Sequence, residues 1–168
     1  MLRRSRFQPA IAITAVVVIG TMLGPLASVQ PSGASTPSLC QKVSAAEVSA
    51  TLGLKATSSS SQVNGSVTVC WYKVGANSQA VYVRTQTGDD TAGFNADQKM
   101  AKTQGENPKA DLKFKPYRAF STTLGSAAYG GVTYSVTVLK KTTELSLGGV
   151  KTSLTSVESL AKKVLAIL

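Results

Sequence analysis

The chain has 168 residues, and its 18 Lys and Arg against 8 Asp and Glu give a formal net charge of +10 at neutral pH. It contains no histidine, so it lacks the most common general base and the most common metal ligand of proteins. We therefore expect a protein that is not an enzyme, with no catalytic residues, no metal site and no cofactor.

The N-terminal segment, residues 1–34, is typical of a secretory signal peptide. Three arginines lie within the first six residues, an uncharged apolar run spans residues 10–27, and a small, polar stretch follows. We expect cleavage after Ala34. The alternatives are cleavage after Ala27 and retention of the apolar run as an N-terminal anchor.

This interpretation predicts a domain organisation and a location. Residues 35–39 form a polar leader and residues 40–168 form a single domain. Three arginines are lost with the signal, so the remaining 15 Lys and Arg against 8 Asp and Glu leave a net charge of +7. We expect the domain to be secreted or to lie at the outer face of the cell envelope, or to be anchored there by an uncleaved N-terminal helix.

Cys40 and Cys70 are the only thiols of the chain. Acylation of Cys40 is disfavoured, because Leu39 stands directly before it where a lipoprotein signal has a small residue. Two cysteines in an exported chain usually pair. We therefore predict a Cys40–Cys70 disulfide, with two free thiols or an intermolecular bond as the alternatives.

The first half of the domain is predicted to contain one helix and one hairpin. A capping box that begins at Ser44 predicts a helix over residues 45–52. A Ser-rich loop or hairpin tip is expected over residues 57–65. Alternation of apolar and polar side chains then predicts two strands, over residues 67–74 and 79–87.

The middle of the domain is predicted to be a shallowly packed helix followed by an edge strand. Acidic residues suited to helix capping precede residues 92–104, where only half of one helical stripe is apolar. Residues 111–119 alternate in polarity, but Pro116 cannot donate to a neighbouring strand, so we expect an edge strand there. Residues 124–131 are expected to form a turn region of small residues.

The last third is predicted to be a hairpin followed by a helix. Residues 132–139 show the cleanest alternation in the chain, and residues 143–147 are expected to pair with them. A second capping box begins at Thr155, and apolar residues then recur at helical spacing up to Leu168.

The elements follow the order α-βββ-α-βββ-α. This order predicts an α+β fold in which an antiparallel β-sheet of about five to six strands has helices packed on one face.

Five short motifs occur in a fixed order along residues 38–168. They are Cys40 before the first helix, the helix end at Glu47–Gly53, Cys70-Trp71-Tyr72 on a strand, Leu124-Gly125-Ser126-Ala127-Ala128 before two strands, and Leu160-Ala161 in the last helix. This order resembles a family of exported actinobacterial proteins of unknown function, many of which are envelope lipoproteins. The family's frequent lipobox is missing here, and Ser126 stands where an acidic residue is common. The resemblance implies an α+β domain in or outside the envelope and implies no activity.

Two patterns associated with chemistry are better explained by helix capping. The run Ser159-Leu160-Ala161-Lys162 matches the Ser-x-x-Lys of penicillin-recognising serine enzymes, but their other motifs are missing or in reversed order. Asp89, Asp90 and Asp97 could bind a cation, but their spacing does not favour metal coordination. We predict neither as a site.

The densest basic segment is a candidate anion-binding edge. Its cations, interleaved with two aromatic residues, are Lys109, Lys113, Lys115 and Arg118. Such a segment fits a polyanionic wall polymer or lipid headgroups. The alternative is that the lysines keep an edge strand from pairing with other chains.

Four aromatic residues on predicted strands form a candidate ligand groove. They are Trp71, Tyr72, Tyr82 and Tyr134. The alternative is that they serve as core residues and cross-strand pairs.

These observations favour a non-catalytic binding or interaction module of the cell envelope. We expect its partner to be an envelope protein, an anionic polymer or lipid headgroups, and not a nucleic acid. The alternative is a small-molecule or lipid carrier with an apolar groove between the sheet and the helices.

Overall fold

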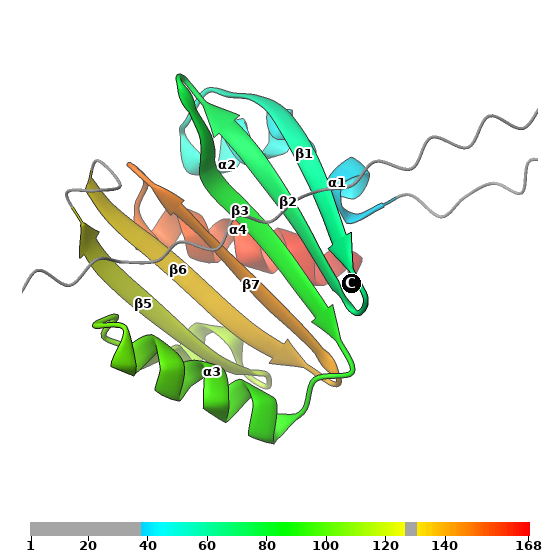
Figure 1. Ribbon diagram of the computed structural model, residues 1–168, viewed down its shortest axis with the longest axis vertical. Helices are drawn as coiled ribbons and strands as arrows, with labels where there is room; N and C mark the ends of the chain where they lie inside the picture. Colours follow the sequence, from blue (N-terminus) through cyan, green and yellow to red (C-terminus); the bar gives the residue numbers. More distant parts are fainter. Residues whose placement is uncertain (1–37, 127–130) are drawn as a thin grey trace, which may run out of the picture. The chain divides into compact units, whose positions relative to one another are not determined.

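Antiparallel pairing joins seven strands into one sheet, in the spatial order β1-β2-β3-β7-β6-β5-β4 (Figure 1). The computed structural model describes residues 38–126 and 131–168. The predicted signal peptide, its cleavage sites, most of the polar leader, and Ala127 and Ala128 of the fourth motif lie outside the described residues. Within the two described ranges, no helix has both the length and the apolar character needed to cross a membrane.

The chain forms two meanders that meet at the β3–β7 pair. The strands are β1 (Ala56–Asn64), β2 (Val67–Val74), β3 (Asn77–Thr87), β4 (Lys109–Ala110), β5 (Arg118–Ser126), β6 (Gly131–Lys140) and β7 (Thr143–Val150). The helices are α1 (Leu39–Lys42), α2 (Ala45–Leu52), α3 (Thr91–Thr103) and α4 (Leu154–Ile167), and η1 (Leu112–Phe114) is a short 3₁₀ helix. The predicted α+β class with an antiparallel sheet is confirmed.

The Ser-rich segment predicted as a loop is the edge strand β1, which makes the sheet larger than the five to six strands expected. Most of its side chains are exposed, so its sequence shows no apolar alternation. Backbone pairing along β2 holds it extended, from Ala56 opposite Val74 to Asn64 opposite Val67.

One face of the sheet, called here the core face, carries most of the apolar core. The register places Val83 of β3 opposite Leu147 of β7, and Leu147 opposite Val136 of β6. Because side chains alternate across a strand, these residues point to the same side of the sheet. They pack against Val157 and Leu160 of α4, and all five side chains are fully buried.

The helix α3 lies on the opposite face, so the expectation that the helices pack on one face is wrong for this element. Phe120 of β5 is paired with Thr137, which points away from the core face because it neighbours Val136 on β6. The ring of Phe94 in α3 packs edge-on against Phe120, with 5.2 Å between ring centroids. This small cluster is separate from the main core.

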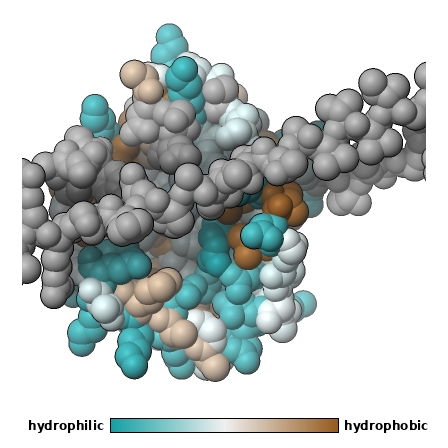
Figure 2. All heavy atoms as spheres, in the orientation of Figure 1, coloured by the Kyte–Doolittle hydropathy of each residue, from teal (hydrophilic) through white to brown (hydrophobic). Residues whose placement is uncertain are grey.

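The face that carries α3 is called here the open face. Figure 1 shows α3 alongside β5, in front of the sheet, with α4 behind it. In Figure 2, where the grey atoms leave α3 visible, its outer surface is mostly hydrophilic with small patches of weakly apolar atoms. The helix buries only Phe94 and Ala101 and leaves Met100 exposed, which agrees with the half-apolar stripe of its sequence.

The segment predicted as an edge strand over residues 111–119 has a different conformation. The Asp111 carboxylate accepts a hydrogen bond from the Lys113 N–H and starts the 3₁₀ turn η1. Phe114 is buried in the main core, which a straight strand at the sheet edge would not allow. The edge strand is instead the two-residue β4, paired with β5.

The last helix begins two residues earlier than predicted from its capping box. The Ser153 hydroxyl accepts a hydrogen bond from the Ser156 N–H, so Ser153 rather than Thr155 is the N-cap. The helix α2 does use the predicted cap, because Ser44 accepts a hydrogen bond from the Glu47 N–H.

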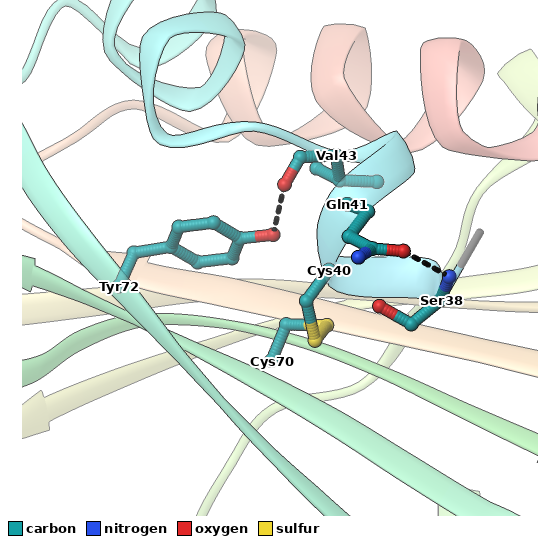
Figure 3. The surroundings of a disulfide bond; sticks show 6 residues. All are labelled: Ser38, Cys40, Gln41, Val43, Cys70 and Tyr72. Carbon is teal, nitrogen blue, oxygen red and sulfur yellow. Dashed lines mark hydrogen bonds between the residues drawn. A yellow bond between two sulfur atoms is a disulfide. The ribbon is translucent and has the colours of Figure 1, made fainter. Parts of the chain in front are cut away.

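The predicted disulfide joins Cys40 of α1 to Cys70 of β2 (Figure 3). Cys70 is fully buried on the core face. The hydroxyl of Tyr72, two residues further along β2, donates to the carbonyl of Val43 at 2.7 Å. The bond and this hydrogen bond together fasten the short N-terminal helix to the sheet. A disulfide is typical of a protein that folds in an oxidising, extracytoplasmic environment.

We expect replacement of both cysteines by alanine to lower the free energy of unfolding by roughly 3.6 kcal/mol, because the bond closes a loop across a sequence separation of 30 residues. Urea unfolding followed by circular dichroism measures this difference. The reduced wild-type protein serves as control, since it loses the bond and keeps both sulfur atoms in the core. Equal stability of the oxidised and reduced proteins would contradict the prediction.

Candidate functional site

Three of the four cations predicted as an anion-binding edge line two adjoining cavities. Lys115 and Arg118 line one, and Lys113 and Lys115 line the other. Arg118 also donates to the Asn95 amide oxygen at 2.8 Å, and its guanidinium lies 5.2 Å from the centroid of Phe94, so it helps to hold α3 against the sheet. Lys109 is an exposed residue of the edge strand β4 and lines neither cavity.

A cluster of lysines from three elements surrounds a cavity of about 380 Å³, called here the lysine cavity. Its cations are Lys113 and Lys115, which lie in and beside η1, Lys140 at the end of β6, and Lys162 of α4. The sequence analysis missed Lys140 and Lys162, because only the pairing of β6 beside α4 and η1 brings them near the predicted pair. Their only sequence signal is that each begins a Lys-Lys pair.

The lysine side chains are positioned by specific partners. The ammonium of Lys140 donates to the carbonyl of Leu165 at 2.7 Å, near the C-terminus of α4, where the helix dipole favours a cation. The ammonium of Lys162 lies 5.8 Å from the centroid of the Phe114 ring. These contacts hold two cations at the rim without neutralising them.

Two carboxylates offset the charge of the lysine cavity, and both act on Lys113. The ammonium of Lys113 bonds both oxygens of Glu158, at 2.8 and 2.6 Å, and Glu158 is buried in α4. This hydrogen bonding, and to a smaller extent the carboxylate of Asp111, raise the pKa of Lys113. Both carboxylates lie beside Lys113, so Lys115, Lys140 and Lys162 keep their charge without an acidic partner among the described residues.

A second cavity, of about 710 Å³, adjoins the lysine cavity and shares Lys115 and Tyr117 with it. It is also lined by Leu112, whose side chain is 68 % exposed, and by Pro116. Such an exposed leucine beside a half-exposed tyrosine and a free lysine makes this end of the domain both cationic and apolar.

The four aromatic residues predicted as a groove lie on opposite faces of the sheet. Trp71 and Tyr82 are a cross-strand pair on the open face, with 5.7 Å between ring centroids. Tyr72 is fully buried on the core face and Tyr134 packs against the same core. The prediction of one groove is therefore wrong, because neighbouring strand residues such as Trp71 and Tyr72 point in opposite directions.

Two adjoining cavities on the open face form one shallow depression, called here the trough. They measure about 370 and 450 Å³ and share Trp71, Tyr82, Glu106 and Ser135. Residues Met100 and Gln104 of α3 form part of the rim. The trough lies between α3 and the strands, on the opposite side of the sheet from the apolar groove that the carrier hypothesis requires.

Hydroxyl groups line the floor of the trough. The Thr122 hydroxyl donates to Glu106 at 2.7 Å and lies 2.6 Å from the Ser135 hydroxyl, and both Thr122 and Ser135 are buried. Burial raises the pKa of the Tyr82 hydroxyl, and the neighbouring hydroxyls of Ser146 and Ser135 oppose the shift. The floor is thus a connected polar network beneath an aromatic pair.

A partly buried ion pair forms part of the trough wall, which Arg84 and Asp97 both line. Arg84 donates to Glu144 at 2.9 Å, it also bonds Gln86, and its guanidinium is 4.0 Å from Asp97 of α3. Burial, and next the carboxylate of Asp97, raise the pKa of Glu144 to about 8, while Arg84 lowers it and Asp89 adds a smaller increase. One oxygen of Glu144 is buried without a hydrogen-bond partner.

The aspartates before α3 and the Ser-x-x-Lys run of α4, which the sequence analysis does not predict as sites, have structural roles. Asp90 caps α3 by accepting from the N–H groups of Ala92 and Gly93. The hydroxyl of Ser159 in the Ser-x-x-Lys run donates to the carbonyl of Thr155 within α4. In the part of the chain that the structure describes, no three acidic or thiol side chains converge to hold a metal ion.

Comparison with known proteins gives no identity. No family model, no curated protein and no solved structure matches this chain. The lysine cavity and the trough are therefore the features of the domain that bear on its function.

We predict that Glu144 makes stability fall as the pH rises from about 4.5 to about 8. Its pKa is higher in the folded state than its ordinary value of 4.5, so the folded protein binds more protons across that window. Glu144→Gln keeps the shape and the acceptor for Arg84 without the titration. Urea unfolding over this pH range should show a flatter profile for the variant, with Glu47→Gln on α2 as control. Parallel profiles for wild type and Glu144→Gln would contradict the prediction.

Proposed function

We propose that this protein is a non-catalytic binding module of the cell envelope that docks on an anionic membrane surface through the lysine cavity. The observation that carries the proposal is the convergence of four lysines from η1, β6 and α4 on one cavity, where the neighbouring carboxylates Glu158 and Asp111 both act on Lys113. Export through residues 1–34 would deliver the domain to that surface, and the disulfide agrees with such a location.

The arrangement of the lysines favours anion binding over protection of an edge strand. Lysines that block edge pairing stand on the edge strand itself. Here only Lys109 does so, whereas Lys140 belongs to an interior strand and Lys162 to a helix. Because these residues come from separate elements, the edge-protection role does not explain why they converge.

The apolar neighbours of the cavity favour a lipid surface over a soluble polymer. Leu112 is largely exposed and Tyr117 is partly so, and both lie beside Lys115. Exposed aliphatic side chains that insert among lipid chains, tyrosines at the headgroup level and lysines toward anionic lipids are the usual elements of interfacial membrane binding. A soluble polyanion needs the lysines but not the exposed leucine.

The expected free energy of membrane binding is that of a reversible, peripheral association. Each lysine near an anionic leaflet contributes about 1 kcal/mol, and the contribution falls off within a Debye length. The three lysines without an acidic partner and one inserted leucine therefore give a binding that is sensitive to salt and stronger at higher anionic lipid content. The resemblance to exported actinobacterial envelope proteins agrees with such a role and is part of the proposal.

We expect the mature domain to sediment with vesicles of equimolar phosphatidylcholine and phosphatidylglycerol, but not with vesicles of phosphatidylcholine alone. The double variant Lys115→Gln/Lys162→Gln should weaken the binding by about thirtyfold, because two lysines contribute about 2 kcal/mol. Added salt should weaken the wild type more than this variant.

The matched control is Lys99→Gln/Lys102→Gln, which removes the same charge from two exposed lysines of α3. Equal losses in the two double variants would show that net charge, and not the lysine cavity, binds the vesicles. Binding to soluble polyphosphate without binding to the vesicles would overturn the membrane proposal in favour of a polymer partner.

A further inference from the structure

We infer that the trough on the open face is a binding site for a neutral saccharide, a ligand with hydroxyl groups at its edges and an apolar face. The inference is independent of the membrane proposal, because the trough and the lysine cavity share no lining residue.

The aromatic pair provides a platform for a sugar ring. Trp71 and Tyr82 stand opposite each other on β2 and β3, and their ring planes are tilted by 55°. Both residues are half-buried, so each ring keeps exposed surface. Trp and Tyr offer a large apolar face at low conformational cost, and a pyranose ring presents its C–H groups to such a face.

The absence of a side chain at Gly148 fixes the position of this platform. A Cβ atom there would lie 3.0 Å from a ring carbon of Tyr82 and 2.9 Å from the carbonyl oxygen of Tyr134. Gly148 of β7 pairs with Tyr82 in the sheet. The Tyr82 ring can therefore lie across β7 toward the trough, an orientation that any larger residue at position 148 would disturb.

The polar wall supplies acceptors and donors for sugar hydroxyls. Only one oxygen of Glu106 is engaged by Thr122, and the residue is half-buried at the trough. The hydroxyls of Thr122 and Ser135 form a chain behind it, which holds Glu106 in place. A carboxylate that accepts from two neighbouring hydroxyls, beside an aromatic ring, is a chemistry suited to carbohydrates.

The charge and size of the trough exclude other ligand classes. Two carboxylates, Glu106 and Asp97, line it with one cation, Arg84, whose guanidinium is paired with Glu144 at 2.9 Å, and this balance disfavours the anions that the lysine cavity attracts. The Glu106 carboxylate disfavours a fatty acyl chain, because such a chain would cover the oxygen of Glu106 that Thr122 does not engage and remove it from water. The two cavities, of about 370 and 450 Å³, lie in the size range of ligand sites.

Trp71 is the only tryptophan of the chain, so its fluorescence reports on the trough directly. We expect titration of the mature domain with maltohexaose, mannohexaose and chitotetraose at millimolar concentrations to change the Trp71 emission saturably for at least one of them. Decanoate, an apolar and anionic probe, should not change it.

Glu106→Gln tests the polar wall without removing the fluorophore. The substitution should lower the affinity for the oligosaccharide by about tenfold, because the hydrogen bonds to a charged acceptor are replaced by bonds to a neutral one. Glu47→Gln, the same change at a half-buried residue of α2, is the matched control and should bind as the wild type.

No response to any of the three oligosaccharides would overturn the inference, and so would a saturable response to decanoate alone. An equal loss of affinity in Glu106→Gln and Glu47→Gln would show that the sugar does not bind at the trough. Vesicle binding is measured separately, so failure of the saccharide site leaves the membrane proposal to its own test.

Discussion

The alternation of side chains across the paired strands β3 and β7 is the constraint on which the whole domain depends. The register puts Val83 opposite Leu147 on the core face and Tyr82 opposite Gly148 on the open face. A shift by one residue would expose the valine and leucine and bury Arg84. The main core and the trough both depend on this pairing.

One face of the sheet carries the core that stabilises the domain, and the other face carries the proposed saccharide site. On the core face, fully buried Val and Leu residues pack against α2 and α4, and the disulfide fastens α1 there. On the open face, hydroxyls, two aromatic rings, Glu106 and the paired charges of Arg84 and Glu144 lie beside a single helix that is attached by a small cluster. A second group of cations lies around η1 and α4, where Glu158 bonds only Lys113. This separation lets one small domain present a cationic end and a trough without an unpaired cation among its lining residues.

Much of the fold could be predicted, because its signals are local. The alternation in Val132–Leu139, the cap at Ser44 and the two lone cysteines each depend on neighbouring residues or on a simple count. The strand β1 could not be predicted, since an exposed edge strand needs no apolar alternation and Ser-rich segments usually form loops. The place of α3 could not be predicted either, because Phe94 reveals which face it covers only once its partner Phe120 is known.

The candidate sites were predicted only in part, and for the same physical reason. Lys113 and Lys115 are close in sequence, so their cluster was visible, but Lys140 and Lys162 join it only through the packing of β6 against α4. The alternative interpretation of the four aromatic residues, as core residues and a cross-strand pair, holds for Tyr72 and for Trp71 with Tyr82, and the sequence does not show which of them face a depression. Glu106 follows the predicted helix, where no sequence pattern indicates that Thr122 holds it.

The most direct test of this account is the relative reactivity of Trp71 and Tyr72, neighbours in sequence that the register assigns to opposite faces. Hydroxyl-radical footprinting read by mass spectrometry compares the two in native and urea-unfolded protein. The account predicts oxidation of Trp71 and protection of Tyr72 in the native state, with both oxidised after unfolding. Comparable native oxidation of Tyr72, or a protected Trp71 beside a reactive Tyr72, would contradict the assignment of the two faces.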